Sequence, residues 1–96
     1  MEEEEIVRRH IATHPVRYEI ARMLLDTSGL FVYEMAEKLE LSEDIVASHL
    51  MYLDDCGIIK TELRETGKQT PVVARYVTPT THLYIMESFL SSLVEK

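Results

Sequence analysis

The feature that most constrains this chain is a change in the spacing of its apolar residues at Gly57. Before Gly57, apolar residues recur at spacings of three and four, as they do over 16–24, and this predicts amphipathic helices. After Gly57, two runs rich in β-forming residues, 58–64 and 72–78, flank a polar loop and predict a β-hairpin. A further apolar stripe after Pro79 predicts a last helix. The chain is therefore expected to fold as several helices with one hairpin before the final helix.

Capping signals place the ends of the central helices. Pro15 is suited to the first turn of a helix, where the missing N–H costs nothing. A short helix is expected over Tyr33–Leu39. Ser42 is a favourable N-cap for a helix over 43–56, and the glycine that follows provides the left-handed stop. The predicted buried face of that helix consists of Val46, Leu50 and Leu53.

The order of these elements predicts the fold class. With a short helix at the start, the order is α-α-α-α-β-β-α, mainly α with a small β-hairpin, which is the layout of a winged helix-turn-helix. We expect one domain over 1–96, with an acidic, disordered start at 1–5. Residues 30–57 would form the helix-turn-helix, 58–78 the wing and 79–94 a helix used for dimerisation.

The composition excludes several classes of protein. With 46% apolar and 28% charged residues, the chain is typical of globular domains. No stretch approaches the roughly 18 consecutive apolar residues of a membrane span, so no membrane partner is expected. The acidic start, Glu2–Glu5, lacks the basic region of a secretory signal. The single cysteine, Cys56, excludes an internal disulfide and multi-cysteine zinc sites. We therefore expect a cytoplasmic protein.

The net charge of −7 is unevenly distributed along the sequence. Residues 33–57 hold seven acidic residues and one basic residue, a net charge of −6. Residues 58–76 hold four basic residues and two acidic ones, a net charge of +2. The predicted helix-turn-helix is therefore acidic and the predicted wing is basic.

Two segments of the chain resemble the ArsR-like winged-helix transcriptional regulators. Members of that family commonly have a His-Pro-x-Arg-x-x-Ile motif, which is present here as His14-Pro15-Val16-Arg17-Tyr18-Glu19-Ile20. Their recognition helix typically has a serine, then Ser-x-His-Leu, then a small residue and glycine. This chain has Ser42, then Ser48-His49-Leu50, then Cys56-Gly57-Ile58-Ile59. The resemblance covers residues from about 6 to 94 and implies a dimeric, DNA-binding transcriptional regulator.

This resemblance, together with the predicted faces, indicates which residues would contact double-stranded DNA. The expected contacts on the recognition helix are Ser42, Asp44, Ile45, Ala47, Ser48 and Tyr52, and those on the wing are Lys60, Arg64, Lys68 and Gln69. Glu43 and Asp44 oppose this reading, because carboxylates do not neutralise phosphates. An acidic protein–protein interaction module, or a mimic of DNA that does not bind DNA, is the alternative.

No metal, thiol or catalytic site is predicted. His82 and Glu87 are five residues apart and fall on different faces of a helix. Acidic neighbours are expected to raise the pKa of Cys56, which disfavours a reactive thiol. We therefore expect no enzyme activity, no cofactor and no metal, and no motif identifies an effector.

The two ends of the chain are the candidates for assembly. In the resembling family the first and last helices form a homodimer interface, and a short first helix is expected here from Ile6 to about Thr13. The alternative is that the last helix is an ordinary core helix packed on its own hairpin. The residues expected at the interface are Ile6, Ile11, Leu83, Met86, Phe89, Leu90 and Leu93.

Overall fold

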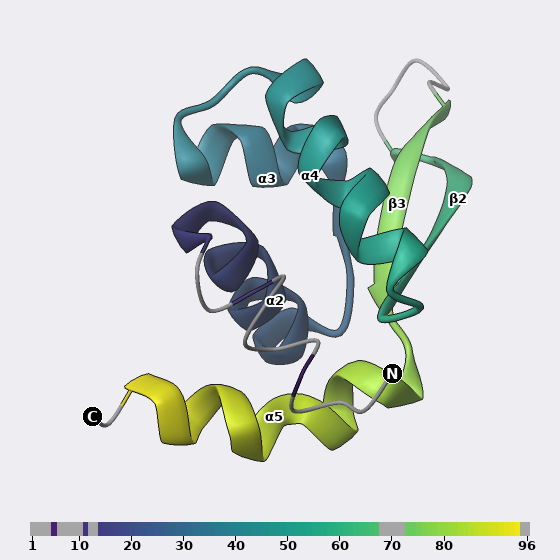
Figure 1. The fold of residues 1–96 in the computed structure, drawn as a ribbon. Coiled ribbons are helices and arrows are strands. Elements are labelled where there is room, and N and C mark those ends of the chain that lie inside the picture. Colours follow the sequence, from purple (N-terminus) through teal and green to yellow (C-terminus); the bar gives the residue numbers. More distant parts are fainter. Residues whose placement is uncertain (1–4, 6–10, 12–13, 68–72, 95–96) are drawn as a thin grey trace.

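The computed structural model describes Glu5, Ile11 and residues 14–67 and 73–94. Four α-helices and three strands are seen in this part of the chain (Figure 1). They are α2 (Pro15–Thr27), β1 (Leu30–Phe31), α3 (Val32–Leu39), α4 (Glu43–Asp55), β2 (Ile59–Glu65), β3 (Val73–Pro79) and α5 (Thr81–Val94). The predicted fold class, a winged helix-turn-helix, is confirmed. The acidic start at 1–5, apart from Glu5, and most of the predicted first helix, from Ile6 to about Thr13, lie outside the described residues.

The helix ends follow the local capping signals. Pro15 occupies the first turn of α2, which ends at Ser28 in the left-handed conformation (φ 66°). Ser42 caps α4, because its hydroxyl oxygen accepts a hydrogen bond from the Ile45 N–H at 3.2 Å. Gly57 follows α4 with φ 76°, a region that L side chains rarely adopt. The predicted N-cap and stop of the recognition helix are therefore confirmed.

The sheet has one strand more than the predicted hairpin. Its order is β1-β3-β2 with antiparallel neighbours, and β1 pairs Leu30 with Val77 and Phe31 with Tyr76. A strand of two residues is too short to show the alternation of apolar and polar residues that predicts a strand, so the sequence does not predict β1. The residue before β1 is a glycine, Gly29, because a Cβ at this position would overlap the hydroxyl group of Tyr76.

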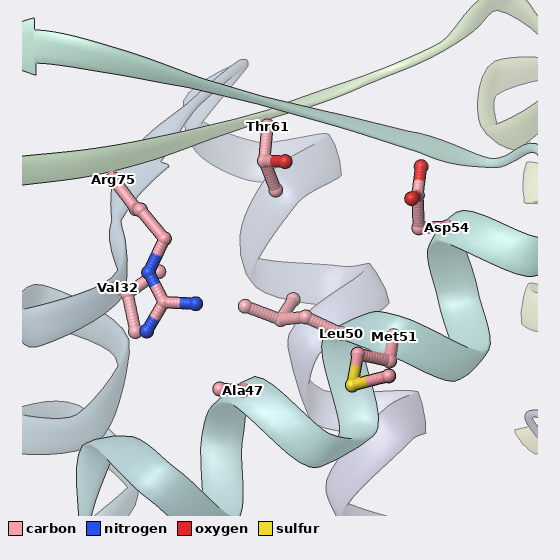
Figure 2. Close-up of a pocket in the computed structure, with 7 residues that line it drawn as sticks. All are labelled: Val32, Ala47, Leu50, Met51, Asp54, Thr61 and Arg75. Carbon is pink, nitrogen blue, oxygen red and sulfur yellow. The ribbon is translucent and has the colours of Figure 1, made fainter.

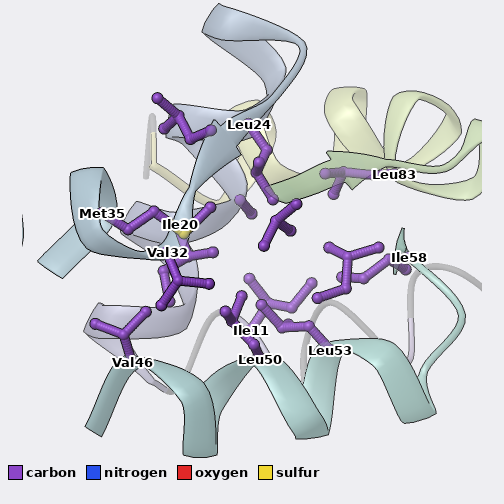
Figure 3. Close-up of a cluster of buried hydrophobic side chains, with 14 of the residues drawn as sticks. Ile11, Ile20, Leu24, Val32, Met35, Val46, Leu50, Leu53, Ile58 and Leu83 are labelled. Carbon is purple, nitrogen blue, oxygen red and sulfur yellow. The ribbon is translucent and has the colours of Figure 1, made fainter. Parts of the chain in front are cut away.

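The core lies between the three-stranded sheet and the helices (Figure 3). From α4 it receives Val46, Leu50 and Leu53, as predicted. It also includes residues that the sequence reading assigned to a dimer interface, which are Ile11, Leu83, Met86 and Leu90, all 0–1% exposed. One protomer already buries these four side chains, and their expected place at a dimer interface stays a prediction. The winged-helix core needs the inner face of α5, which packs on α2 and β3.

The other three residues predicted at the dimer interface are Ile6, Phe89 and Leu93. Phe89 is partly buried against the same core. Ile6 and the side chain of Leu93 lie outside the described residues. The exposed face of α5 instead shows Tyr84 and Ile85, which are 45% and 51% exposed. No helix in the described part of the chain combines the length and the apolar character that crossing a membrane requires.

Candidate nucleic-acid interface

The outer face of α4 is the surface that the fold leaves open. Because Val46, Leu50 and Leu53 hold the helix on the core, the opposite face projects outward. Its apolar side chains are unusually open, with Met51 70%, Tyr52 53% and Ile45 46% exposed. Three polar residues on or beside this face are also exposed, Ser42, Asp44 and Ser48, and Ala47 is half-buried. The structure thus brings together the six residues predicted on the recognition helix and adds Met51.

Arg17 fastens one side of α4 to α2. Its side chain comes from the His-Pro-x-Arg segment and is only 6% exposed. The guanidinium lies 3.9 Å from the centre of the Tyr52 ring, within cation–π range. Its Nε–H donates a hydrogen bond to Nδ1 of His49 at 3.4 Å. The side chain of Tyr52 is therefore exposed to solvent and at the same time held in place by Arg17.

The hydrogen bond from Arg17 sets the protonation state of His49. A nitrogen that accepts a hydrogen bond carries no proton, so His49 is neutral in this arrangement. Burial lowers the pKa of His49 below its ordinary value of 6.5, and the positive charges of Arg17 and His14 lower it further. The sequence reading noted Arg17 and His49 only as parts of motifs. Their contact spans 32 positions and has no local signal.

A groove separates the other side of α4 from the wing. It has a volume of about 90 Å³ and opens to solvent. Figure 2 shows the side chains of Thr61 and Arg75 extending from the strands toward α4. The residues that line the groove are Val32, Ala47, Leu50, Met51, Asp54, Thr61 and Arg75. A single guanidinium and a single carboxylate thus lie in a groove beside the recognition helix whose lining is equally polar and apolar.

The two faces of the wing carry different side chains. In the antiparallel register Thr61 is opposite Val77 and Leu63 is opposite Arg75, so these residues share the face that continues from the core. Successive side chains of a strand point to opposite faces. Lys60 and Arg64 therefore lie on the outer face, turned away from α4.

Arg64 is engaged on that outer face. Its guanidinium forms an ion pair with Glu62 at 2.6 Å and lies 4.1 Å from the centre of the Tyr76 ring. Tyr76 in turn makes an edge-to-face contact with Phe31. Lys60 and Arg64 thus lie on the face of the wing that is turned away from α4, and their expected contacts with DNA stay a prediction. Lys68 and Gln69 lie outside the described residues.

Arg75 is the basic residue that the sequence reading missed. It was counted in the charge of the wing but not placed among the candidate contacts. Strand alternation starting from the buried Ile59 and Val77 was the available signal, since Arg75 has the same parity as Val77. Using that signal required knowing that Val77 faces the core, which the tertiary packing decides.

The other candidate chemistries have little support in this part of the chain. Among the described residues, no three or more His, Cys, Asp or Glu side chains form a group that could hold a metal ion. Burial raises the pKa of the Cys56 thiol, Arg17 opposes the shift and Asp55 adds to it. The direction agrees with the sequence reading, although burial rather than the acidic neighbours is the main cause.

Comparison with known proteins then places this geometry in a family. The model of the bacterial regulatory proteins of the arsR family matches residues 14–61, which span the helix-turn-helix and the start of β2. The chain belongs to the ArsR family. It is a DNA-binding transcriptional regulator with a winged helix-turn-helix fold.

Individual relatives of this ArsR-family chain agree with that assignment. It is 28% identical over 83 residues to an uncharacterised HTH-type transcriptional regulator of Methanocaldococcus jannaschii, covering 86% of this chain and 84% of the relative. A transcriptional regulator homologue from Pyrococcus horikoshii superposes with a TM-score of 0.76 at 29% identity, covering 99% of this chain and 93% of that one. HlyU from Vibrio cholerae superposes with a TM-score of 0.68 at 27% identity, covering 97% and 94%.

Proposed function

We propose that this regulator acts as a homodimer and binds double-stranded DNA through α4, with the hairpin 58–78 as a wing beside it. The observation that carries the proposal is the outer face of α4, which the core leaves open on a helix that is firmly seated. A recognition helix of this kind lies in the major groove, and its N-terminal residues contact base edges. Ser42, Asp44, Ile45, Ala47, Ser48 and Tyr52 are the proposed contacts.

The acidic residues at the start of α4 are compatible with this role. Ser42 and the dipole at the N-terminus favour acidic side chains there, so Glu43 and Asp44 also stabilise the helix end. A carboxylate in the major groove also accepts a hydrogen bond from cytosine N4. Asp44 is therefore proposed as a base contact, while neutralisation of phosphates falls to residues outside α4.

The proposal of a homodimer rests on α5 and on the family. The inner face of α5 packs on the core of its own protomer, but Tyr84 and Ile85 on the outer face of α5 remain exposed. In Figure 1 the C-terminal end of α5 extends past α2, where a second copy has access to it. Two copies related by a two-fold axis present two recognition helices to two half-sites. We infer a regulatory rather than a catalytic role, exercised in the cytoplasm, where the DNA lies.

Binding to mixed-sequence DNA at increasing salt concentration tests this function. The logarithm of the binding constant should fall linearly with the logarithm of the salt concentration, with a slope of about −0.9 for every phosphate neutralised. The measurement is fluorescence anisotropy of a labelled duplex between about 50 and 200 mM NaCl. If the duplex is not bound even at the lowest salt concentration, the DNA-binding proposal is wrong and the acidic interaction module takes its place.

A further inference from the structure

The recognition helix does not carry the cations that a DNA duplex needs. From Glu40 to Ile59 there is no lysine or arginine, and seven residues over 33–57 are acidic. An α-helix with its side chains is about 10–12 Å wide and fills a major groove about 12 Å wide. The phosphates on the rims of that groove therefore lie along the flanks of α4. Any phosphate contact must come from an element that borders one of these flanks.

One described cation borders the flank next to the wing. Arg75 extends from β3 into the groove between α4 and the sheet, and its guanidinium lies beside Val32 with Ala47 and Leu50 nearby (Figure 2). The residue is exposed, so its charge faces solvent rather than the core. Within the described chain, Arg75 has no ion-pair partner within 4 Å, in contrast to Arg64.

The register places Arg75 at the level of the N-terminal half of α4. Arg75 is paired with Leu63, two residues closer to the tip of the hairpin than the pair of Thr61 and Val77. Along the groove, Arg75 accordingly lies toward Ala47, whereas Asp54 lies at the other end (Figure 2). The N-terminal half of a recognition helix is the part that enters the major groove most deeply. Arg75 is therefore next to the part of α4 that would carry the base contacts.

We propose that Arg75 binds a backbone phosphate of the DNA at the rim of the major groove that α4 occupies. The inference rests on the proposed function and adds to it the residue that neutralises the duplex beside an acidic helix. A guanidinium can bind the two oxygens of one phosphate with parallel hydrogen bonds, so this contact also fixes the register of the protein on the duplex.

The outer face of the hairpin is less suited to this contact. Arg64 has the same charge and lies on the neighbouring strand, but its side chain points away from α4. It is also held by the carboxylate of Glu62 and the ring of Tyr76. Releasing it would break an ion pair and a cation–π contact, whereas no ion pair or cation–π contact within the described residues holds Arg75.

A comparison of Arg75 and Arg64 variants tests the inference. The probe is a fluorescein-labelled mixed-sequence duplex of about 30 base pairs, and the measured quantity is the dependence of the binding constant on NaCl concentration. Arg75→Gln removes the charge but keeps most of the side chain, and it should reduce the magnitude of the salt slope by about 0.9 per bound protomer. Arg75→Lys keeps the charge and should retain the slope of the wild-type chain. Arg64→Gln should change the slope by clearly less than Arg75→Gln.

The outcomes separate this inference from the proposed function. If the wild-type chain binds the duplex and Arg75→Gln keeps the wild-type slope, the phosphate contact is not made by Arg75, although DNA binding stands. If Arg64→Gln reduces the slope as much as Arg75→Gln does, the assignment of the contact to the inner face of the wing is overturned. If the wild-type chain does not bind, the proposed function itself fails. Thermal unfolding followed by circular dichroism checks that all three variants remain folded, as expected for exposed side chains.

Discussion

Arg17 links the amino-terminal motif of the family to the recognition helix. It is a buried cation that reaches from α2 to two successive turns of α4, contacting His49 and Tyr52. Burial of a charge is unfavourable unless its polar atoms find partners, and the aromatic ring and the imidazole nitrogen supply two. Arg17 therefore has a structural role in this chain, because it holds the side of α4 that faces away from the wing.

The protonation of His49 makes the packing of α4 on α2 dependent on pH. The pKa of His49 is lower in the folded chain than its ordinary value of 6.5 in the unfolded chain. The unfolded state therefore binds more protons between these two values, and stability rises with pH across that window. The contribution of the neutral imidazole is complete above pH 6.5 and is lost as pH falls toward the folded pKa.

We predict that the variant His49→Gln removes this part of the pH dependence. Glutamine keeps a side-chain oxygen that can accept a hydrogen bond from Arg17 but does not titrate. The free energy of unfolding, measured with urea, should fall more in the wild-type chain than in the variant between about pH 7.5 and pH 5. Other groups titrate equally in both chains, so the difference isolates His49. A difference between the two chains that is constant with pH would contradict the prediction.

At the scale of elements, α4 depends on its first residue. The hydroxyl oxygen of Ser42 accepts the Ile45 N–H, one of the four N–H groups at the start of a helix that have no partner within it. The Ser48 hydroxyl donates to the Ile45 carbonyl at 2.7 Å and so returns to the same turn. The base contacts proposed for this turn therefore rest on a local arrangement that Ser42 begins.

We predict that Ser42→Ala lowers the free energy of unfolding by about 1 kcal/mol, because an N-terminal N–H loses its partner. The matched variant Ser42→Asn keeps a capping oxygen and should lie within a few tenths of a kcal/mol of the wild-type chain. Urea unfolding at neutral pH measures both. Equal destabilisation by the two variants would show that something other than the cap is responsible.

The wing is the second element whose structure decides its role. Successive side chains of both strands point to opposite faces of the hairpin. Arg75, which is paired with Leu63, lies on the inner face, the face toward α4. A shift of one residue in the register would exchange the faces of the whole hairpin. The buried Ile59 and Val77, which are 2% and 0% exposed, oppose such a shift because it would move them into solvent.

At the scale of the whole molecule, the outer face of α5 decides the assembly. The core uses one side of this helix and leaves Tyr84 and Ile85 on the other. The chain is elongated, 45 × 25 × 21 Å, and α5 runs along the lower edge of the molecule in Figure 1. A second copy that packs on this side would place its α4 at a distance from the first, as two half-sites require.

We predict that Ile85→Glu disrupts the homodimer, since a charge at a packed interface is costly. Sedimentation equilibrium should give twice the chain mass of 11.1 kDa for the wild-type protein and a single chain mass for the variant. Leu63→Glu makes the same change at a side chain of the wing that is 71% exposed and should leave the mass unchanged. A wild-type protein that sediments as a monomer would overturn the proposed dimer.

The sequence alone determined the features that depend on near neighbours. The cap at Ser42, the left-handed stop at Gly57 and the buried face of α4 follow from interactions within a few residues, and all three are confirmed. The tertiary structure alone decided what depends on distant contacts. It paired β1 with β3, buried Leu83, Met86 and Leu90 in one protomer and turned Arg75 toward α4. These outcomes arise because strand register and helix packing join residues tens of positions apart, and no local pattern encodes which partner a surface will meet.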